Sequence, residues 1–418
     1  MYLCTRILSR RFTSVIERTR SRSGAFVESL EESRVLVLYT GGTLGMRRDE
    51  TGTLNCEKGT FIYRDRSITR LYLTHKHFKG YLTERLKGEI LTQEGMPKCD
   101  VLEYEDLIDS SFMSPERWKR IAGDIEERYE KYDGFVIAHG TDTMAYTASA
   151  LSFMLGNLGK PVILTGSNIP MCEPINDAAR NLTASILYAG ALDVPEVCIF
   201  FNNQLLRGNR TVKVDNGGLN AFESPNYPPL ATLKVNTKLH SEYVLRYPRR
   251  KFKVRKSMQE NVLVVKLVPG FQDEAIQCMI EHSELNGLVF EFYGSGNGLD
   301  RKTALCDAIQ SAIEKDIVVV AATQCLRGTV DLSAYKAGVD AELASHVVSS
   351  GDMTTEATVT KLSYLLGLGL PLSEVRDLME KPLCGELTTL KEYKNVDLTN
   401  RSPSVLSPVR SNSFFFNE

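Results

Sequence analysis

The chain has 418 residues and a mass of 46.7 kDa, which predicts two domains at about 150 residues per domain. Lysine and arginine number 50 against 52 aspartates and glutamates, so the formal charge of -2 gives no support for a nucleic-acid-binding protein. A hydrophobic content of 43% with 24% charged residues excludes a wholly disordered or collagen-like chain.

The cysteines and the apolar stretches exclude two further classes. Nine cysteines form an odd, scattered set without a Cys-x-x-Cys pair, which argues against a disulfide framework and against a cysteine zinc cluster. We therefore expect a reducing compartment. No stretch approaches about 18 uninterrupted apolar residues, so we expect no transmembrane span and no membrane partner.

The two ends of the chain differ in composition from the middle. The first 30 residues are rich in serine and hold six arginines against two acids, Glu17 and Glu28, a composition similar to that of a mitochondrial transit peptide. The two acids weaken that interpretation. We favour a disordered basic leader, residues 1–33, on a cytoplasmic protein, and keep mitochondrial import as the alternative. Residues 398–418 contain Ser-Pro pairs and predict a disordered tail.

Short apolar runs alternate with helical patterns between these ends, as in α/β proteins whose parallel sheet is covered on both faces. The strands predicted in the first half are Val35–Tyr39, Gly134–Ala138, Val162–Thr165 and Val197–Phe201. Helices are predicted over Met144–Leu155 and Asp177–Tyr188. After residue 260 the pattern predicts strands at Val262–Leu267, Gly287–Phe292 and Ile317–Ala322, with helices at Glu274–Ser283 and Lys302–Glu314.

Two successive α/β units follow from this pattern. We expect a larger N-terminal parallel-sheet domain, residues 34–245, and a smaller Rossmann-like C-terminal domain, residues 261–397. The linker between them, residues 246–260, carries seven basic residues and no acid from Arg246 to Lys256. A solvated linker or edge segment is the favoured interpretation, and a polyanion-binding site is the alternative.

Ligands of open parallel sheets bind beyond the carboxyl ends of the strands, so the loops there are the places to look for chemistry. The loop after the first strand has paired glycines, Gly41 and Gly42, which let the backbone approach a ligand closely. Thr40 and Thr43 stand on either side of the pair. This loop therefore presents hydroxyl groups to a ligand.

The loop after the second strand contains Thr141 and Asp142, which we expect where a helix begins. Free N–H groups at a helix start favour a carboxylate or a developing oxyanion, whereas the plainer alternative is that both residues cap the helix. Lys213 follows a later strand; a partly desolvated lysine beside an acid can accept a proton, although a lone lysine is most often a solvated charge. A hydroxyl, a lysine and an aspartate fit an activated nucleophile, provided that they meet in space.

Signatures of other chemistries are missing or weak. The sequence has no P-loop, no Gly-x-Ser-x-Gly elbow and no His-Glu-x-x-His zinc motif. His75 and His77 lie in a basic stretch without carboxylates, which argues against a metal site. Cys325 follows a strand without a visible partner, and we expect a packed thiol there.

Four segments carry a resemblance to a known family: YTGGTLGM (39–46), GFVIAHGTDTMAYTASALSFML (134–155), TGSNIPM (165–171) and LLRGNRTVKVD (205–215). They closely resemble the type I, cytosolic-type L-asparaginases. Further matches at 292–298, 323–330 and 352–367 extend the resemblance over essentially the whole folded span. The ankyrin repeats that animal relatives carry after this module are not expected here.

The resemblance implies hydrolysis of the side-chain amide of L-asparagine to L-aspartate and ammonia, in two displacement steps without metal or organic cofactor. By this resemblance, Thr43 is the nucleophile that forms a β-acyl intermediate. Thr141, Asp142 and Lys213 are the second triad, with Lys213 as proton acceptor. The family also implies a homodimer or homotetramer whose site lies at the dimer interface.

The substrate contacts follow from the same resemblance. Ser110 and Ser111 would hold the α-carboxylate of asparagine, and Thr141 and Asp142 would line the pocket, with Asp142 holding the α-ammonium. Asn297 of a partner chain is a further expected contact.

The chain departs from the family at three places near the site. Thr53 stands where many bacterial members have a lid tyrosine, and Tyr335 is the candidate catalytic substitute, with a purely structural tyrosine as the alternative. Phe112 replaces the acid that usually follows the serines, and Asn168 stands where glutamine is common. Neither Phe112 nor Asn168 removes a reacting group.

Minor glutaminase activity is expected, because one methylene supplies only about 1–3 kcal/mol of discrimination. One alternative is a lysophospholipase-type esterase, for which the sequence offers no serine elbow. The other is a catalytically idle asparagine-binding or amidotransferase-associated subunit, which the presence of all four reacting residues disfavours.

Overall fold

The computed structural model describes residues 32–48, 54–55, 95–235, 237–270, 273–297, 304–332 and 346–388. The chain divides into two units. The first comprises Met1–Glu260, Thr354–Pro371 and Leu383–Gly385, and the second comprises Asn261–Met353, Leu372–Pro382 and Glu386–Glu418. Among the described helices, none combines the length and apolar character needed to cross a bilayer.

The first unit is built on an eight-stranded sheet with the order β13-β12-β9-β8-β7-β5-β1-β4. Five neighbouring strands run parallel: β8 (Val197–Phe201), β7 (Val162–Thr165), β5 (Gly134–Ala138), β1 (Arg34–Gly41) and β4 (Lys98–Ile108). The sheet continues antiparallel through β9 (Gln204–Arg207), β12 (Ala231–Leu233) and β13 (Thr237–Leu239). Every residue of β5, β7 and β8 is buried, which explains their uninterrupted apolar sequences.

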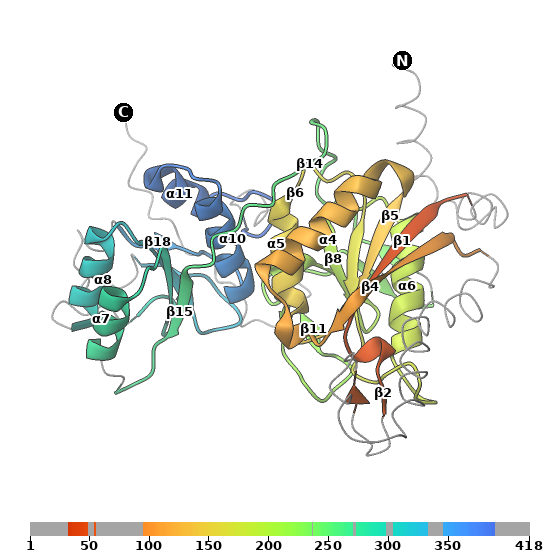
Figure 1. Ribbon diagram of the computed structural model, residues 1–418, viewed down its shortest axis with the longest axis horizontal. Helices are drawn as coiled ribbons and strands as arrows, with labels where there is room; N and C mark the ends of the chain where they lie inside the picture. Colours follow the sequence, from red (N-terminus) through yellow and green to blue (C-terminus); the bar gives the residue numbers. More distant parts are fainter. Residues whose placement is uncertain are drawn as a thin grey trace. The chain divides into compact units, whose positions relative to one another are not determined.

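Helices cover both faces of this sheet (Figure 1). One face packs against α6 (Ala178–Ala191), with Val35 and Val37 of β1 in one core cluster with Leu182 and Ile186. Because strand side chains alternate between faces, Leu36 and Leu38 point the other way. On that side α5 (Met144–Met154) packs against β7 and β8, and both α4 (Pro115–Arg128) and α10 (Thr355–Gly367) pack against α5.

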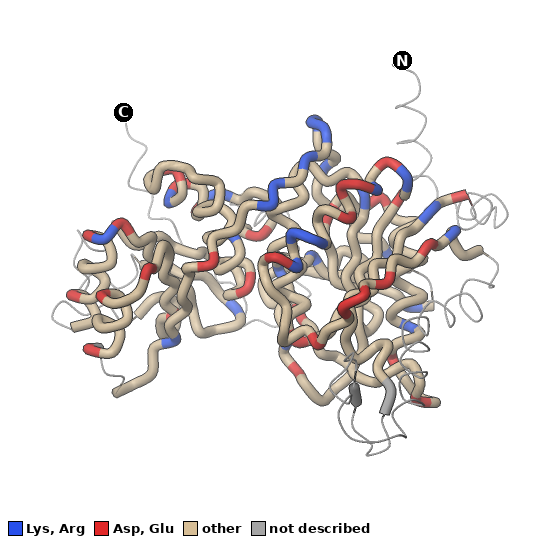
Figure 2. The backbone as a smooth tube through the Cα atoms, in the orientation of Figure 1, with Lys and Arg blue, Asp and Glu red and all other residues tan. Residues whose placement is uncertain are grey.

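The basic segment 246–260 packs along the edge of the first unit. Its strand β14 (Lys253–Val254) pairs antiparallel with β6 (Leu155–Gly156). The ring of Phe252 stacks on Tyr129 with a centroid distance of 3.7 Å. The basic side chains on either side of Phe252 are exposed, and Figure 2 shows blue positions along this segment. The segment is therefore an edge segment with a solvated basic face.

The second unit has a four-stranded parallel sheet of order β15-β16-β17-β18. Its strands are β15 (Val262–Lys266), β16 (Gly287–Phe292), β17 (Val318–Thr323) and β18 (Val348–Ser349). Its described helices are α7 (Asp273–His282), α8 (Ala304–Glu314) and α11 (Leu372–Met379). The predicted fold class is thus confirmed: a large, mostly parallel sheet is followed by a smaller parallel one.

Helix α10 belongs to the first unit, although it follows the strands of the second along the chain. Tyr364 of α10 stacks with Phe153 of α5, with ring centroids 6.0 Å apart. Thr354 caps α10 by accepting a hydrogen bond from the Ala357 N–H over 3.2 Å. The first unit thus includes segments, Thr354–Pro371 and Leu383–Gly385, that come after residue 261, where the sequence analysis begins the C-terminal domain.

Candidate active site

The strand order places the predicted loops at one edge of the large sheet. Strand β1 lies between β4 and β5, and the chain runs from β1 to β4 on one side before it crosses to β5 on the other. The winding thus reverses between β1 and β5, and ligands of α/β sheets bind beyond the carboxyl ends of the strands at such a point. Thr43, Ser110 and Thr141 follow these three strands.

Two glycines bring the loops after β1 and β5 into contact. Gly42 has a φ of +84°, and a Cβ on it would overlap the backbone of Gly140. A Cβ on Gly140 would lie 2.6 Å from the Oγ of Ser110. Both positions therefore require glycine. Because the two glycines touch, the loop that carries Thr43 and the loop that carries Thr141 lie side by side.

The Thr43 segment is a short 3-10 turn, Thr43–Gly45, held from two sides. The Met46 N–H donates to the Thr43 carbonyl over 3.0 Å and ends the turn. From the loop after β7, the Met171 N–H donates to the Leu44 carbonyl over 3.1 Å. Leu44 is buried, whereas Thr43 is half-buried. The turn is thus anchored by Leu44 while Thr43 keeps access to solvent.

Lys213, Thr141 and Asp142 meet in space. The Nζ of Lys213 donates to the Oγ1 of Thr141 over 2.8 Å and to the Oδ1 of Asp142 over 2.6 Å. Thr141 is buried, and the Lys213 side chain is 16% exposed against 63% for Asp142. The lysine is therefore largely removed from water, with a hydroxyl on its buried side and a carboxylate toward solvent. The hydroxyl, the lysine and the aspartate whose meeting the sequence analysis made a condition of an activated nucleophile are thus in contact.

The start of helix α5 agrees with the predicted Met144 and decides whether Thr141 and Asp142 cap it. The helix begins at Met144 and its N-cap is Thr143, which makes no side-chain capping hydrogen bond. Thr141 and Asp142 thus precede the helix, and the alternative that both cap it is wrong. Their side chains turn toward Lys213 instead, because the ion pair and hydrogen bond to Nζ satisfy both polar groups.

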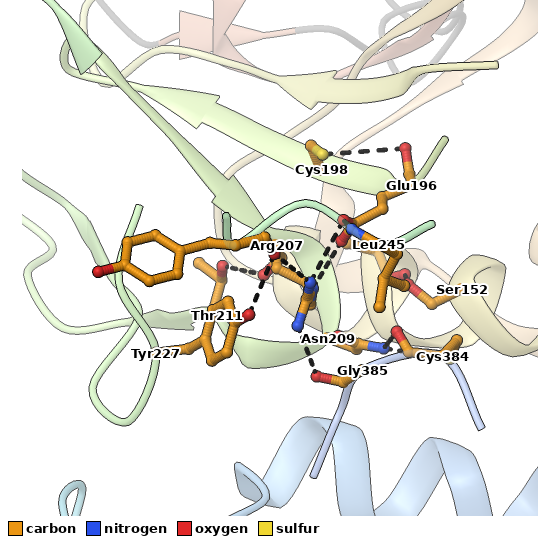
Figure 3. A network of polar contacts seen from close by, with 12 residues as sticks. Ser152, Glu196, Cys198, Arg207, Asn209, Thr211, Tyr227, Leu245, Cys384 and Gly385 are labelled. Carbon is orange, nitrogen blue, oxygen red and sulfur yellow. Dashed lines mark hydrogen bonds and ion pairs between the residues drawn. The ribbon is translucent and has the colours of Figure 1, made fainter. Parts of the chain in front are cut away.

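A buried polar network fixes the turn that leads to Lys213 (Figure 3). The 3-10 turn η5 (Gly208–Arg210) joins β9 to β10 (Val212–Lys213), and β10 pairs antiparallel with β11 (Phe222–Glu223). At the entrance of the turn, the guanidinium of Arg207 binds the carboxylate of Glu196, and both side chains are buried. The Oγ1 of Thr211 donates to the Arg207 carbonyl over 2.7 Å. The backbone on both sides of η5 is therefore constrained.

Family models match the chain over both units. The model of the asparaginase N-terminal domain matches residues 34–245, and the model of the glutaminase/asparaginase C-terminal domain matches residues 261–379. The chain belongs to the asparaginase family.

Asparaginase relatives match over most of the chain. L-asparaginase 1 of Escherichia coli K12 is 39% identical over 361 residues, which cover 86% of this chain and 99% of that protein. The 60 kDa lysophospholipase of Mus musculus is 40% identical over 363 residues, and the match spans 85% of this chain but only 63% of the mouse protein. The crystal structure of L-asparaginase I from Vibrio cholerae superposes with a TM-score of 0.73 at 37% identity, covering 86% of this chain and all of that one.

The two serines of this asparaginase-family chain have different surroundings. Both lie in the 3-10 turn Ser110–Phe112, whose N-cap Asp109 accepts the Ser111 N–H over 2.8 Å. Ser110 is buried beneath Gly140, and its carbonyl accepts the Oγ1 of Thr143 over 2.7 Å. Ser111 is exposed, as is Phe112. Ser110 is thus packed against the loop that follows β5, whereas Ser111 faces solvent.

The other predicted residues belong to the second unit or fall outside the described residues. Asn297 is in the second unit; its side chain is exposed and its backbone pairs with Tyr293. Tyr335 and Thr53, like the basic leader, lie outside the described residues. Cys325 is exposed rather than packed, so that expectation is wrong; its loop turns outward after β17, where its N–H donates to Thr323 Oγ1 over 3.0 Å.

The sequence analysis missed one buried group next to the contacts of Lys213 with Thr141 and Asp142. His139 directly follows β5, and its Nδ1 lies 2.7 Å from the Gly140 carbonyl. Its Nε2 lies 3.0 Å from the Oγ1 of Thr147, which also accepts the indole N–H of Trp118 over 2.9 Å. Burial lowers the pKa of His139 to about 4. The sequence did contain a feature that could have indicated this residue: His139 stands directly between an apolar strand and the Gly140-Thr141 pair.

Proposed function

We propose that this chain hydrolyses the side-chain amide of L-asparagine to L-aspartate and ammonia. The observation that carries the proposal is the contact of Lys213 with both Thr141 and Asp142, beside the loop that carries Thr43. Membership of the asparaginase family and the similarity to proteins named L-asparaginase support this substrate.

The chemistry proposed has two steps. In the first, the hydroxyl oxygen of Thr43 attacks the side-chain amide carbon of asparagine, and the carbon–nitrogen bond breaks as ammonia leaves, so that a β-acyl ester on Thr43 remains. In the second, a water molecule attacks this ester, which releases aspartate and restores the Thr43 hydroxyl. Lys213 in its uncharged form accepts the Thr43 proton through the Thr141 hydroxyl, and this proton passes to the departing amide nitrogen so that it leaves as ammonia. Asp142 holds the lysine in place.

The substrate is a zwitterion, so its pocket needs one cation site and one anion site. We assign the α-ammonium to Asp142, whose carboxylate is 63% exposed, and the α-carboxylate to Ser110 and Ser111. Asn297 of a partner copy and Tyr335 are proposed to complete the pocket. Glutamine, one methylene longer, is proposed as a weaker substrate because such a difference discriminates by only about 1–3 kcal/mol.

The direct test is ammonia release from asparagine and from glutamine by the purified full chain. Thr43→Ala and Lys213→Met are expected to lower kcat for asparagine by about 1000-fold or more, as loss of a nucleophile or its base does in other hydrolases. Matched controls are Thr183→Ala, on α6, and Lys234→Ala, an exposed lysine, which are expected to keep wild-type turnover. Wild-type turnover by both Thr43→Ala and Lys213→Met would overturn the assigned roles.

The same preparation separates the rival functions. The mouse relative is named a lysophospholipase, so fatty-acid release from lysophosphatidylcholine in place of ammonia release would favour esterase activity. Calorimetric binding of asparagine without product would favour an idle binding subunit. We further propose a cytoplasmic homodimer or homotetramer, which analytical ultracentrifugation and fractionation of cells test.

A further inference from the structure

A hydrogen-bond chain runs through the core behind the triad. Its members come from three elements of the first unit: Trp118 on α4, Thr147 on α5, and His139 with Gly140 after β5. The consecutive heavy-atom distances are 2.9, 3.0 and 2.7 Å. His139 and Thr147 are fully buried, so water does not replace these contacts.

The chemistry of the two ends and the burial of the ring together fix the direction of every bond in this chain. The indole nitrogen of Trp118 only donates, and the Gly140 carbonyl only accepts. Nδ1 of His139 therefore carries a proton, which it donates to the Gly140 carbonyl. His139 is fully buried, which disfavours a second proton on the ring and lowers its pKa to about 4. Nε2 is then bare, so the Thr147 hydroxyl accepts from Trp118 and donates its own proton to Nε2.

The last acceptor of the chain belongs to the peptide that carries Thr141. Packing against Ser110 forces glycine at position 140, and glycine lets the peptide that follows it rotate at little cost. In a trans peptide the carbonyl and the next N–H point in opposite directions, so a bond to the Gly140 carbonyl fixes the Thr141 backbone as well. Without that bond, Thr141 loses its alignment with Lys213.

We propose that His139 is a positioning residue, which Trp118 and Thr147 hold as the Nδ1–H tautomer so that it fixes the Gly140–Thr141 peptide against Lys213. This inference rests on the proposed function, because it assigns to His139 the alignment of the hydroxyl that Lys213 contacts. His139 itself does not touch Lys213 in the hydrogen bonds described.

Two substitutions at position 139 separate positioning from packing. His139→Asn keeps an N–H donor on Cγ, where histidine has Nδ1, and loses the contact with Thr147. His139→Gln reaches Thr147 with its longer amide and loses the donor on Cγ. Both remove the ring, so their losses in stability should be similar. With asparagine, His139→Asn should keep kcat within about threefold of wild type, while His139→Gln should lose about 10- to 100-fold in kcat with KM nearly unchanged.

A second pair tests the relay. Thr147→Val is isosteric but lacks the hydroxyl and should lower kcat, whereas Thr147→Ser should restore it. Trp118 is the only tryptophan in the chain, so its emission reports the indole contact without background. Thr147→Val should shift that emission, and Thr147→Ser should not.

The tautomer is measured directly. ¹⁵N-histidine NMR of the full chain, with the His139 signals identified by their loss in His139→Asn, should show a protonated Nδ1 and a bare Nε2, unchanged from about pH 5.5 to 8. Titration near the ordinary histidine pKa, an Nε2–H tautomer, or equal kcat in His139→Asn and His139→Gln would each overturn the proposal. A wild-type chain that releases no ammonia from asparagine would instead overturn the proposed function, while the tautomer and emission results would still decide whether the relay exists.

Discussion

Arg207 donates hydrogen bonds to both carboxylate oxygens of Glu196, from Nε over 2.6 Å and from Nη2 over 3.2 Å. Their side chains are only 1% and 2% exposed. The guanidinium also donates to the carbonyls of Tyr243 and Gly385 and lies over the ring of Tyr227 at 4.3 Å (Figure 3). This buried ion pair therefore joins the residue before β8 to the end of β9. Through the two carbonyls it also holds Tyr243, just before the basic segment, and Gly385, near the end of the described chain.

Burial alone would lower the pKa of the Arg207 guanidinium, but the charge of Glu196 outweighs burial and raises it. Arg207 thus stays charged, and removal of the Glu196 carboxylate leaves this charge buried without its partner. Glu196→Gln should lower the free energy of unfolding by about 3–5 kcal/mol. Urea unfolding followed by the emission of Trp118, which lies in the first unit, is the measurement.

The matched control is the surface pair Arg34–Asp100, whose side chains are 51% and 54% exposed. Asp100→Asn should change the free energy of unfolding by less than about 1 kcal/mol. The double variant Glu196→Leu with Arg207→Met should be less destabilised than the sum of its single variants, because no charge remains buried. Additive losses would show that the ion pair is not the source of the effect.

Gly140 tests the close packing of the loop after β5 against Ser110 in the loop after β4. In Gly140→Ala the new methyl would lie 2.6 Å from Ser110 Oγ and 2.7 Å from Ser110 Cβ, so the loops must part. We expect a loss of about 100-fold in asparagine turnover, as for a reacting group displaced by about 1 Å. Gly217→Ala, whose methyl would meet nothing closer than 3.8 Å, is the control and should be silent.

Ser110→Gly combined with Gly140→Ala removes the clash. The double variant should recover stability relative to Gly140→Ala, measured by thermal unfolding. It should not recover the apparent KM for asparagine, because Ser110 is proposed to bind the α-carboxylate. Recovery of both would remove Ser110 from the substrate site.

The edge segment can be tested through its aromatic contact. Phe252→Leu loses the stacking on Tyr129, worth about 0.5–1.5 kcal/mol for an aromatic pair, and should lower the free energy of unfolding of the first unit by that order. Tyr247→Leu, at an exposed ring in the same segment, should change it by less than about 0.5 kcal/mol. Equal effects would mean that the segment does not contribute to the first unit through Phe252.

The predicted strands that agree with the structure share a physical cause. β5, β7 and β8 are covered on both faces, so their sequences are apolar throughout, and this pattern predicts buried parallel strands. β4 was not predicted, since it is an edge strand whose residues are mostly half-buried or exposed and whose sequence, KCDVLEYEDLI, mixes acids with apolar residues. α4 was missed for a similar reason: its polar face dominates its composition.

The sequence predicted which loops carry the candidate residues, but not which side chains contact one another. The loops that carry Thr43, Thr141 and Lys213 follow strands, which identifies them as candidates. The contact between Lys213 and Thr141 depends on the turn η5 and on the Arg207–Glu196 pair. Both contacts join residues that are distant along the chain, so no local sequence pattern predicts them. His139 escaped notice because its role depends on Thr147 and Trp118, which come from two helices with no local motif.

The burial of His139 makes stability depend on pH in a defined window. Its pKa in the folded chain is about 4, while an exposed histidine in the unfolded chain has a pKa near 6.5. Between these values the unfolded chain binds a proton that the folded chain does not, so protonation favours unfolding. The stability contributed by neutral His139 is therefore fully present above about pH 6.5 and is lost as the pH falls toward 4.

His139→Asn removes this titration and should flatten that part of the profile. Relative to the variant, the wild type should lose about 3 kcal/mol of unfolding free energy between pH 7 and pH 4, because each unit of pKa difference corresponds to about 1.4 kcal/mol. Urea unfolding at half-unit pH intervals, followed by Trp118 emission, gives the difference curve. A curve that is flat across this window would mean that His139 titrates in the folded chain near its ordinary pKa, which would contradict the neutral His139 on which the donor chain from Trp118 to Gly140 depends.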